Sequence, residues 1–442
     1  MPTTDLPAAA RLIVIGGGVH GLSAAWHLAQ ELTDRGDKPD VIVLEKSLIG
    51  GGASGISGGI VRNYYRSEAM TEVIAESVKI FESDAEGFGF HQVGYIAVVP
   101  EAQREDLEAI AERQRDVGYE SELASGASHC HQYLEWLWPD VNSDGVEAVL
   151  HEKRSGWADA IGTVRNLARN AREAGVRIFE GVEAVGLEYS GTEVSAVVTT
   201  AGTVRCEALL AAPGLWAPQW WRMQGLDPVV TVGEGDTAEQ RPLSEYWLAR
   251  EGDFVLPGVG LAGKAGRAAP VVHFDHAAPL YSDRDGELIT DEPWGIYFRM
   301  GKTGGGIVGG ALPLAMGPDF IVDPYGPDNP EQLAGDDLSE FFTSGLAFVL
   351  KRFRGAGARW DANPNGGVLA LTPDRYPVAD WTAPNVYSIL DAGHGFKMLA
   401  VGREAAREIL GHRPSPLLAP FRLSRFGDGT THVVSKSPYP WT

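Results

Sequence analysis

The first 66 residues alternate between short apolar runs and a stretch with helical spacing. Residues 12–15 and 41–44 are continuous apolar runs of the length expected for buried strands. Between them, apolar side chains recur at the intervals of one helix face, at Leu22, Ala25, Trp26 and Leu28. The pattern therefore predicts a strand, a helix and a second strand in one βαβ unit.

Three glycines lie between the first strand and the helix, at Gly16, Gly18 and Gly21. In this spacing the first permits a tight turn, the second permits close approach of a pyrophosphate, and the third permits close packing of the helix on the sheet. The helix N-terminus then presents free N–H groups to the phosphates. Glu45 ends the second strand, where a carboxylate can accept hydrogen bonds from ribose hydroxyls and would repel a 2′-phosphate. The unit therefore predicts a dinucleotide site for FAD or NAD rather than NADP.

Similar patterns predict further elements along the chain. Helices are expected over residues 67–83, 101–117, 163–174, 331–353 and 398–410. Strands are expected over residues 92–99, 229–232, 271–274, 295–300, 306–309 and 386–390, and an apolar strand leads into Pro213 and Gly214. Four short segments separated by glycine turns predict an antiparallel meander: 176–179, 182–189, 194–199 and 203–206.

These elements predict a composite α/β fold with two domains and a C-terminal extension. Strands and helices alternate in three segments that we assign to one discontinuous dinucleotide-binding domain of the Rossmann type: 1–90, 150–221 and 356–415. Residues 91–149 and 222–355 carry short strands, and the longer of these segments is rich in Pro, Gly and charges. There we expect a substrate domain built on an antiparallel sheet. Residues 416–442 form a Pro-rich, aromatic extension without a clear regular pattern.

The composition is that of a globular protein, because 44% of the 442 residues are hydrophobic and 22% are charged. No apolar run approaches the roughly 18 residues of a membrane helix. The first residues lack a basic segment followed by an apolar core. We therefore expect neither a membrane span nor a secretory signal. The formal net charge of −22 argues against nucleic acid and anionic membranes as partners.

The two cysteines, Cys130 and Cys206, are too few for a disulfide framework or a metal site of four sulfurs. They are in keeping with a reducing compartment, and we expect a cytoplasmic protein. His129 and His131 flank Cys130, but no second cluster accompanies them. We therefore expect ordinary packing there and no metal site.

Several stretches together resemble the D-amino-acid oxidase superfamily of FAD-dependent oxidoreductases, in particular its sarcosine oxidase, dimethylglycine dehydrogenase and glycine oxidase branch. They are GGGVHGLSAAW at 16–26, AAPGLW at 211–216, TPDRYPVAD at 372–380 and DAGHGFKMLAVG at 391–402. Two more stretches are similar to the β subunit of heterotetrameric sarcosine oxidase: GGIVRNYYRS at 58–67 and FRLSRF at 421–426. The resemblance covers nearly the whole chain and is weakest over 222–355.

The resemblance implies that four segments of the chain bind FAD. The ADP half would be held by Gly16, Gly18, Val19, His20, Gly21, Glu45 and Lys46. The loop beside the ribityl chain and the flavin ring would contribute Gly52, Ala53, Ser54, Gly58 and Gly59. Val182 would meet the adenine, and the strand end beside the nucleotide would contribute Ala212, Gly214 and Trp216. The flavin ring and its O2 edge would be bordered by Gly393, Gly395, Phe396 and Lys397.

The resemblance also implies a substrate site beside the flavin. Arg66 and Lys397 lie at positions where relatives clamp a substrate carboxylate, and the alternative for Arg66 is a structural ion pair at the domain boundary. Tyr297 resembles an active-site tyrosine on a strand above the flavin, with an ordinary strand aromatic as the alternative. His394 lies near this site as a candidate base, which only a hydroxyl substrate would need.

Three departures from the relatives change what is expected. Gly367 stands where monomeric relatives tether FAD through a Cys, and residues 54–59 lack the His that others use, so FAD is expected to be non-covalent. Residues 154–164 lack the His that carries FMN in the heterotetrameric enzyme, so FMN is not expected. Ile307 and Ala311 replace the Lys and His of simple oxidases, which puts the reaction with O2 and a sarcosine-like pocket in doubt.

The main functional hypothesis is FAD-dependent oxidation of a C–N bond in a small amine or amino acid. Hydride transfer to flavin N5 would give an imine, and the electrons would pass to O2, giving hydrogen peroxide, or to an electron carrier. Two alternatives stay open at this point. One is a dehydrogenase of a 2-hydroxy acid or polyol, and the other is an FAD-bearing subunit of a multi-protein complex that uses the extension as a contact surface. The sequence leaves the oligomeric state open.

Overall fold

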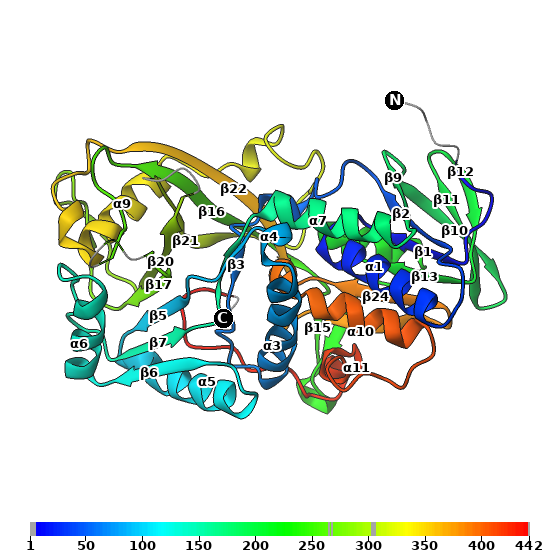
Figure 1. The fold of residues 1–442 in the computed structure, drawn as a ribbon, viewed down its shortest axis with the longest axis horizontal. Helices are drawn as coiled ribbons and strands as arrows, with labels where there is room; N and C mark the ends of the chain where they lie inside the picture. The colour runs from blue at the N-terminus through cyan, green and yellow to red at the C-terminus, as the bar shows by residue number, and fades with distance from the viewer. Residues whose placement is uncertain (1–5, 264–265, 267, 302–305, 441–442) are drawn as a thin grey trace.

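The computed structural model describes residues 6–263, 266, 268–301 and 306–440 (Figure 1). Most of its strands belong to two sheets that lie side by side along the long axis of the molecule. In Figure 1 the larger, eight-stranded sheet occupies the left half and a six-stranded sheet occupies the right half. The predicted composite α/β fold is confirmed.

The six-stranded sheet contains the predicted βαβ unit. Its strands are β1 Leu12–Ile15, β2 Val41–Glu45, β9 Arg177–Glu180, β13 Ala208–Ala211, β23 Val378–Ala383 and β24 Val386–Leu390. They are ordered β23-β24-β13-β1-β2-β9, and every neighbouring pair is parallel except β23 with β24. The central strands are apolar at almost every position because both faces of a parallel sheet are covered.

Helices cover one face of this sheet and a smaller sheet covers the other. The covering helices are α1 Val19–Asp34, α3 Glu68–Ser83, α7 Ala160–Glu173 and α10 Leu399–Ile409. Val14 and Val43 point toward them, whereas Ile13 and Ile42 point to the opposite core, because side chains alternate along a strand. That second core includes Trp220 from α8 Ala217–Met223.

The predicted meander is correct for three of its four segments. β10 Ala184–Ser190, β11 Glu193–Thr199 and β12 Gly202–Arg205 form an antiparallel three-stranded sheet. Residues 177–180, by contrast, belong to β9 and pair in parallel with β2. This strand follows α7, and a strand that follows a crossover helix returns in parallel to the same sheet.

The eight-stranded sheet is antiparallel, as predicted, except for one parallel pair between β5 and β17. Its order is β22-β16-β21-β20-β17-β5-β7-β6. The strands are β5 Tyr95–Val99, β6 Ser121–Ser125, β7 Ala148–Glu152, β16 Glu245–Val255, β17 Val271–His276, β20 Trp294–Met300, β21 Gly306–Gly317 and β22 Asp361–Leu371. Three helices accompany it: α5 Arg104–Asp116, α6 Ala127–Leu137 and α9 Asp337–Val349.

Small elements join or decorate these two parts. β3 Ile60–Val61, β8 Gly156–Ala158 and β4 Phe90–His91 form a three-stranded sheet. Two antiparallel pairs are β14 Val229–Val232 with β15 Glu239–Pro242, and β18 Leu280–Tyr281 with β19 Leu288–Thr290. The short helices are α2 Ala53–Ile56, α4 Ala85–Phe88 and α11 Ser424–Gly427. The last of these lies in the extension, where no regular element was expected.

One expected helix is shorter in the structure, and the position of one strand bears on an expected domain boundary. The helix expected over 331–353 is α9 and extends only from 337 to 349. The expected division at residue 356 would place residues 361–371 with the dinucleotide-binding domain, whereas these residues form β22 at the edge of the larger sheet. Within the described ranges, none of the helices combines the length and apolar character needed to cross a lipid bilayer.

Candidate functional site

A cavity opens where β1 and β2 end, and we call it the nucleotide cavity. Its wall contains most of the residues predicted to hold the nucleotide half of FAD, together with three that were predicted to lie beside the ribityl chain and the flavin ring, namely Gly52, Ala53 and Ser54. Together they are Gly16, Gly18, Val19, His20, Glu45, Lys46, Gly52, Ala53, Ser54, Val182, Ala212, Gly214 and Trp216. Segments that are far apart in the sequence are thus brought to one edge of the six-stranded sheet, as their positions at strand ends predict.

The glycine turn is sterically required at two of its positions. Gly16 has a φ of +104°, and a Cβ there would collide with the carbonyl oxygen of Ala212. A Cβ at Gly21 would collide with the carbonyl oxygen of Gly16. Gly21 therefore does not line the cavity but lets α1 approach the turn closely, which is the packing role expected for the third glycine.

Hydrogen bonds hold Glu45 at the edge of this cavity. Its Oε2 accepts from the backbone N–H of Gly17 at 2.7 Å, and its Oε1 accepts from the backbone N–H of Ser47 at 2.8 Å. The carboxylate is thus fixed at the end of β2, next to the turn. A carboxylate in this place is suited to accept from ribose hydroxyls.

An acid that the sequence did not suggest lies at the mouth of the nucleotide cavity. Asp323 follows β21 and accepts a hydrogen bond from Trp216 Nε1 at 2.9 Å. The Lys46 ammonium lies 3.1 Å from the same carboxylate and 3.8 Å from the centre of the Trp216 ring. Asp323 comes from a Pro- and Gly-rich segment whose pattern predicted no element, so no signal marked it.

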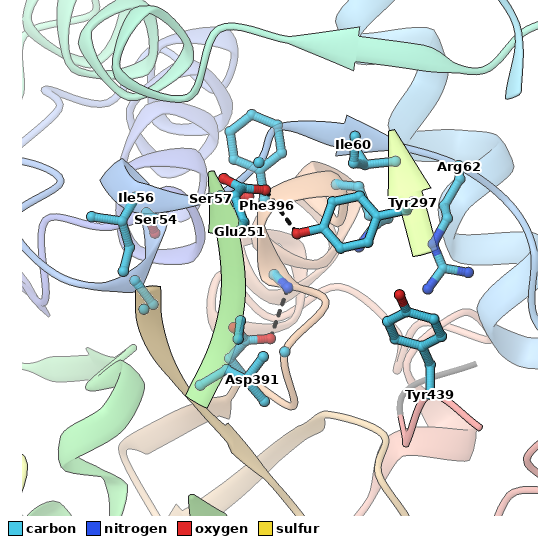
Figure 2. A pocket seen from close by; sticks show the side chains of 18 of the residues that line it. Ser54, Ile56, Ser57, Ile60, Arg62, Glu251, Tyr297, Asp391, Phe396 and Tyr439 are labelled. Atoms are coloured by element: carbon cyan, nitrogen blue, oxygen red, sulfur yellow. Dashed lines mark hydrogen bonds between the residues drawn. The ribbon is translucent and has the colours of Figure 1, made fainter. Parts of the chain in front are cut away.

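A second cavity adjoins the first, and we call it the inner cavity (Figure 2). The two cavities share Ala53, Ser54 and Asp391 in their walls. The predicted residues that line the inner cavity are Gly58, Tyr297, Gly393, Gly395, Phe396 and Lys397. It also contains Arg62, the first residue of the segment 62–66 that was expected to begin the substrate site, and four charged or aromatic side chains that were not predicted: Tyr95, Glu251, His273 and Tyr439. A ligand long enough to extend through both cavities would therefore meet nucleotide-type contacts at one end and these side chains at the other.

Two cations lie in the inner cavity. Arg62 is buried, donates to the carbonyl oxygen of Tyr64 at 2.8 Å and has its guanidinium 4.8 Å from the centre of the Tyr65 ring. Lys397 is also buried, and burial together with the neighbouring Arg62 cation lowers the pKa of its ammonium to about 7, although Asp391 partly opposes this effect. The charge of Lys397 therefore changes near neutral pH.

Tyr297 lines the inner cavity and donates its hydroxyl hydrogen to Glu251 Oε2 at 2.8 Å, the hydrogen bond drawn in Figure 2. Burial raises the pKa of the Glu251 carboxyl, and the Tyr297 hydrogen bond and the Arg299 cation counter part of that shift. Burial also raises the pKa of Tyr297, so the hydroxyl is neutral. Glu251 lies in a strand whose buried and more exposed positions alternate. An acid in such a strand usually faces water, and this is why the sequence did not single it out.

Asp391 connects the two cavities as a fixed negative charge. Its Oδ1 accepts from the backbone N–H groups of Ala392, His394 and Gly395, at 2.7, 3.1 and 2.7 Å. Burial opposes its charge, but these donors and the nearby His20 and His394 lower its pKa to about 2. His20 Nε2 lies 3.9 Å from this carboxylate, and neither ring nitrogen of His20 makes a hydrogen bond to the residues that the structure describes.

Arg66 lies away from both cavities. Its Nε is 3.0 Å from Asp106 Oδ1, and it lines neither cavity. Asp106 belongs to α5 and is almost fully buried, and a buried carboxylate needs a cation or hydrogen-bond donors close by. Arg66 therefore forms the structural ion pair that was the alternative for it, and Arg62 is the arginine in the inner cavity.

His394 and Gly59 also lie outside both cavities. His394 Nδ1 is 3.1 Å from the Tyr65 hydroxyl, and its Nε2 is 3.1 Å from the carbonyl oxygen of Arg375. Burial and the cations Lys397 and Arg62 hold the pKa of this imidazole well below its usual value. Both ring nitrogens are thus engaged by the protein.

Comparisons with known proteins identify the family of the chain. A family model described as "FAD dependent oxidoreductase" matches residues 11–408. The chain is similar to the mitochondrial dimethylglycine dehydrogenase of Rattus norvegicus, at 27% identity over 228 residues that cover 50% of this chain and 26% of that protein. It is also similar to sarcosine oxidase subunit beta of Rhizobium meliloti (strain 1021), at 29% identity over 220 residues that cover 49% and 52%. The matched region is thus about half or less of the length of these curated relatives.

Solved structures share the fold over almost the whole chain. The L-proline dehydrogenase from P. horikoshii superimposes with a TM-score of 0.73 at 22% identity, covering 95% of this chain and 98% of that one. Glycine oxidase from Geobacillus kaustophilus superimposes with a TM-score of 0.69 at 17% identity, covering 95% and 99%. At these identities the likeness concerns the fold.

Proposed function

The chain belongs to the family of FAD dependent oxidoreductases, and from this we propose that it oxidises a C–N bond of a small amine or amino acid. The substrate would lose two electrons and two hydrogens, one as hydride and one as a proton. The imine that results would add water and separate into a carbonyl compound and an amine. The observation that carries the proposal is that the nucleotide cavity joins an inner cavity with two buried cations and a carboxylate.

The nucleotide cavity fits FAD in its chemistry. α1 begins after Gly18, and Gly18, Val19 and His20 at its N-terminus line the cavity, where the Val19 N–H donates to Ser54 Oγ at 3.2 Å. The buried ring nitrogens of His20 lack hydrogen bonds to the described part of the chain. Such donors suit a pyrophosphate. We assign the ADP half to this cavity, with Glu45 toward the ribose, and the flavin end to the boundary of the two cavities near Ser54. Bound FAD supplies the hydride acceptor.

We propose that this FAD is non-covalent. Gly367 lines the inner cavity and offers no side chain to attach it, and a Cβ at this position would collide with Ile56. Acid precipitation should therefore release all flavin into the supernatant. Yellow colour that stays in the pellet would contradict the proposal.

Arg62 is the residue that we propose for the substrate carboxylate, in place of Arg66. It carries a fixed charge in a buried, aromatic environment, where attraction for an anion is stronger than in water. Lys397 lines the same cavity and adds a second positive charge when it is protonated. An anionic amino acid held by both would have a defined orientation.

Glu251 and Tyr297 are proposed to face the amine end of the substrate. In Figure 2 Tyr297 lies between Glu251 and Arg62. An amine must be unprotonated to be oxidised by hydride loss, because its lone pair forms the new C=N bond. Glu251 has a raised pKa and is therefore suited to hold a proton that leaves the substrate nitrogen.

The electron acceptor of the second half-reaction is proposed to be O2 or an electron carrier. Ile307 and Ala311 are both buried in the apolar core beneath the larger sheet, so β21 brings neither a Lys nor a His to the inner cavity at these two positions. Lys397 is then the cation that would favour reaction with O2. We further infer a reducing, cytoplasmic setting, since Cys130 and Cys206 are free thiols.

Anaerobic titration of the purified flavoprotein tests the proposed function. We expect N-methyl amino acids or amino acids to bleach the flavin absorbance and 2-hydroxy acids to leave it unchanged. Bleaching by hydroxy acids alone would contradict the proposal in favour of the dehydrogenase alternative. Bleaching that requires a partner protein would favour the subunit alternative, a possibility raised by the relative that is named as a subunit.

A further inference from the structure

The C-terminal extension contributes to the wall of the inner cavity. Tyr439 lines this cavity, although it lies in the extension, which only the subunit alternative gave a role, as a contact surface. Figure 1 shows the chain passing from α11 toward β5 before it reaches the C-terminal mark. Figure 2 shows the Tyr439 ring rising toward Arg62 and Tyr297. The cavity is therefore bounded on this side by a segment that belongs to neither main sheet.

The Tyr439 ring is tightly packed. Only 1% of its surface is exposed, and its centre lies 4.9 Å from the His273 ring and 6.3 Å from the Tyr297 ring. β20 makes room for it with Gly295, where a Cβ would lie 2.9 Å from Tyr439 Cε2. The position of this ring is therefore set by both the extension and the larger sheet.

Hydrogen bonds to buried acids fix the segment that carries Tyr439. The backbone N–H of Lys436 donates to Asp106 Oδ2 at 2.7 Å, and Asp106 is the carboxylate that also binds Arg66. Ser437 Oγ donates to Asp275 Oδ2 at 2.8 Å. Asp275 is fully buried, and its Oδ1 lies 2.9 Å from His273 Nε2, so Ser437 supplies a hydrogen bond to the second oxygen of a buried carboxyl group.

A second set of contacts holds the extension further upstream. Arg425 Nε lies 2.7 Å from Asp374 Oδ2 in an ion pair whose side chains are each only 3% exposed. The Tyr376 hydroxyl donates to the carbonyl oxygen of Val433 at 3.1 Å. The extension is thus attached along its length and does not hang loosely over the cavity.

We propose that Tyr439 is a specificity-determining residue that limits the size of the group a ligand places beside Arg62. The inference rests on the proposed function in one respect, namely that the inner cavity binds the substrate. A rigid, buried ring excludes any substituent that would need its volume, because tightly packed walls yield little. The preferred substrate class is therefore small amino acids, and bulky substituents near the carboxylate are rejected.

Binding of carboxylates to the holoenzyme tests the proposal without turnover. Acetate, pyrrole-2-carboxylate and 1-naphthoate would be titrated while the change in flavin absorbance is recorded. Tyr439→Ala should improve the affinity for 1-naphthoate relative to acetate at least about tenfold. Tyr439→Phe should keep the wild-type ratio, because the ring volume is retained. Ser437→Ala, which loosens the segment, should shift the ratio in the direction of Tyr439→Ala by a smaller factor.

The outcomes separate this inference from the proposed function. The role of the ring would be overturned if Tyr439→Ala left the affinity for 1-naphthoate relative to acetate unchanged. It would also be overturned if Tyr439→Phe changed this ratio as much as Tyr439→Ala does. If Tyr439→Ala yields no folded flavoprotein, Tyr439→Leu supplies the same comparison. Carboxylate binding without oxidation of any amine would overturn the proposed function alone. Failure of every carboxylate to perturb the wild-type flavin would overturn both.

Discussion

Arg62 and Arg66 lie four residues apart and have different surroundings. Arg62 is buried against tyrosine rings in the inner cavity, whereas Arg66 is partly exposed and pairs with Asp106. The difference arises because Asp106 on α5 supplies a buried carboxylate at one position, and Tyr65 supplies an aromatic face at the other. We therefore move the proposed carboxylate clamp from Arg66 to Arg62, and the resemblance does not separate the two because both residues lie in the same short motif.

Arg62→Met should weaken binding of an anionic substrate much more than Arg66→Met does. Loss of a buried cation that faces a carboxylate should raise KM at least about 30-fold. Arg66→Met removes the same charge outside the cavity. We expect it to lower the stability, because buried Asp106 loses its cation, and to change KM less than about threefold. Steady-state kinetics of both variants decide the assignment, and a larger effect in Arg66→Met would restore the first hypothesis.

Carboxylate binding should weaken as the pH rises through neutrality. The pKa of Lys397 is lowered to about 7, so the ammonium is present below that pH and is lost above it. The dissociation constant of acetate should therefore rise several-fold between about pH 6 and pH 9. Lys397→Arg should abolish this dependence because a guanidinium stays charged throughout. A wild-type dissociation constant that does not change with pH, or that is larger at acid pH, would contradict the assignment.

At the scale of elements, the βαβ unit at the start of the chain is the part that the sequence predicts best. The strand ends, the glycine spacing and the acid at residue 45 are local features, so their pattern can be recognised without knowledge of the fold. The inner cavity is different, because Glu251, His273 and Tyr439 come from two strands and an extension that meet only in the folded chain. Each has an ordinary local context, and this is why none was predicted.

Gly21→Val tests whether FAD binding and stability depend on the close packing of α1 against the glycine turn. A side chain at this position collides with the carbonyl oxygen of Gly16, which would push the helix away from the turn. We expect a loss of most bound FAD and a decrease of about 1–3 kcal/mol in the free energy of unfolding. Gly427→Ala is the control, because its Cβ would meet no neighbour. The flavin-to-protein absorbance ratio and urea unfolding measure the two effects, and a fully flavinated Gly21→Val protein would refute the packing role.

At the scale of the whole molecule, the two sheets meet around the two cavities. Asp323 follows β21 of the larger sheet, whereas its partners Lys46 and Trp216 follow β2 and β13 of the smaller one. This contact therefore connects the two halves across the mouth of the nucleotide cavity. The expected domain division remains a proposal, but the position of β22 indicates that the chain crosses between the halves later than residue 356.

Asp323→Ala should let FAD leave faster. The Asp323 side chain is half-exposed and its ion pair is screened by solvent, so we expect a two- to fivefold increase in the dissociation rate, about 0.4–1 kcal/mol. The difference should shrink at high salt. Asp328→Ala removes the same charge from the same exposed segment without a contact to the cavity, and it serves as the control. Stopped-flow fluorescence of released flavin measures the rate. Equal rates for Asp323→Ala and Asp328→Ala at low salt would show that the contact does not retain FAD.

The strand order of the six-stranded sheet has a consequence for how the protein is made. β1, which leads into the glycine turn, pairs with β13, and β13 pairs in turn with β24 at residues 386–390. Until that last strand emerges from the ribosome, one edge of β13 has unpaired backbone groups. Pairings between such distant segments form slowly. We therefore expect cofactor capture to come late in biosynthesis, and we expect the first 90 residues alone not to form a transplantable nucleotide-binding module, although they carry the whole glycine motif.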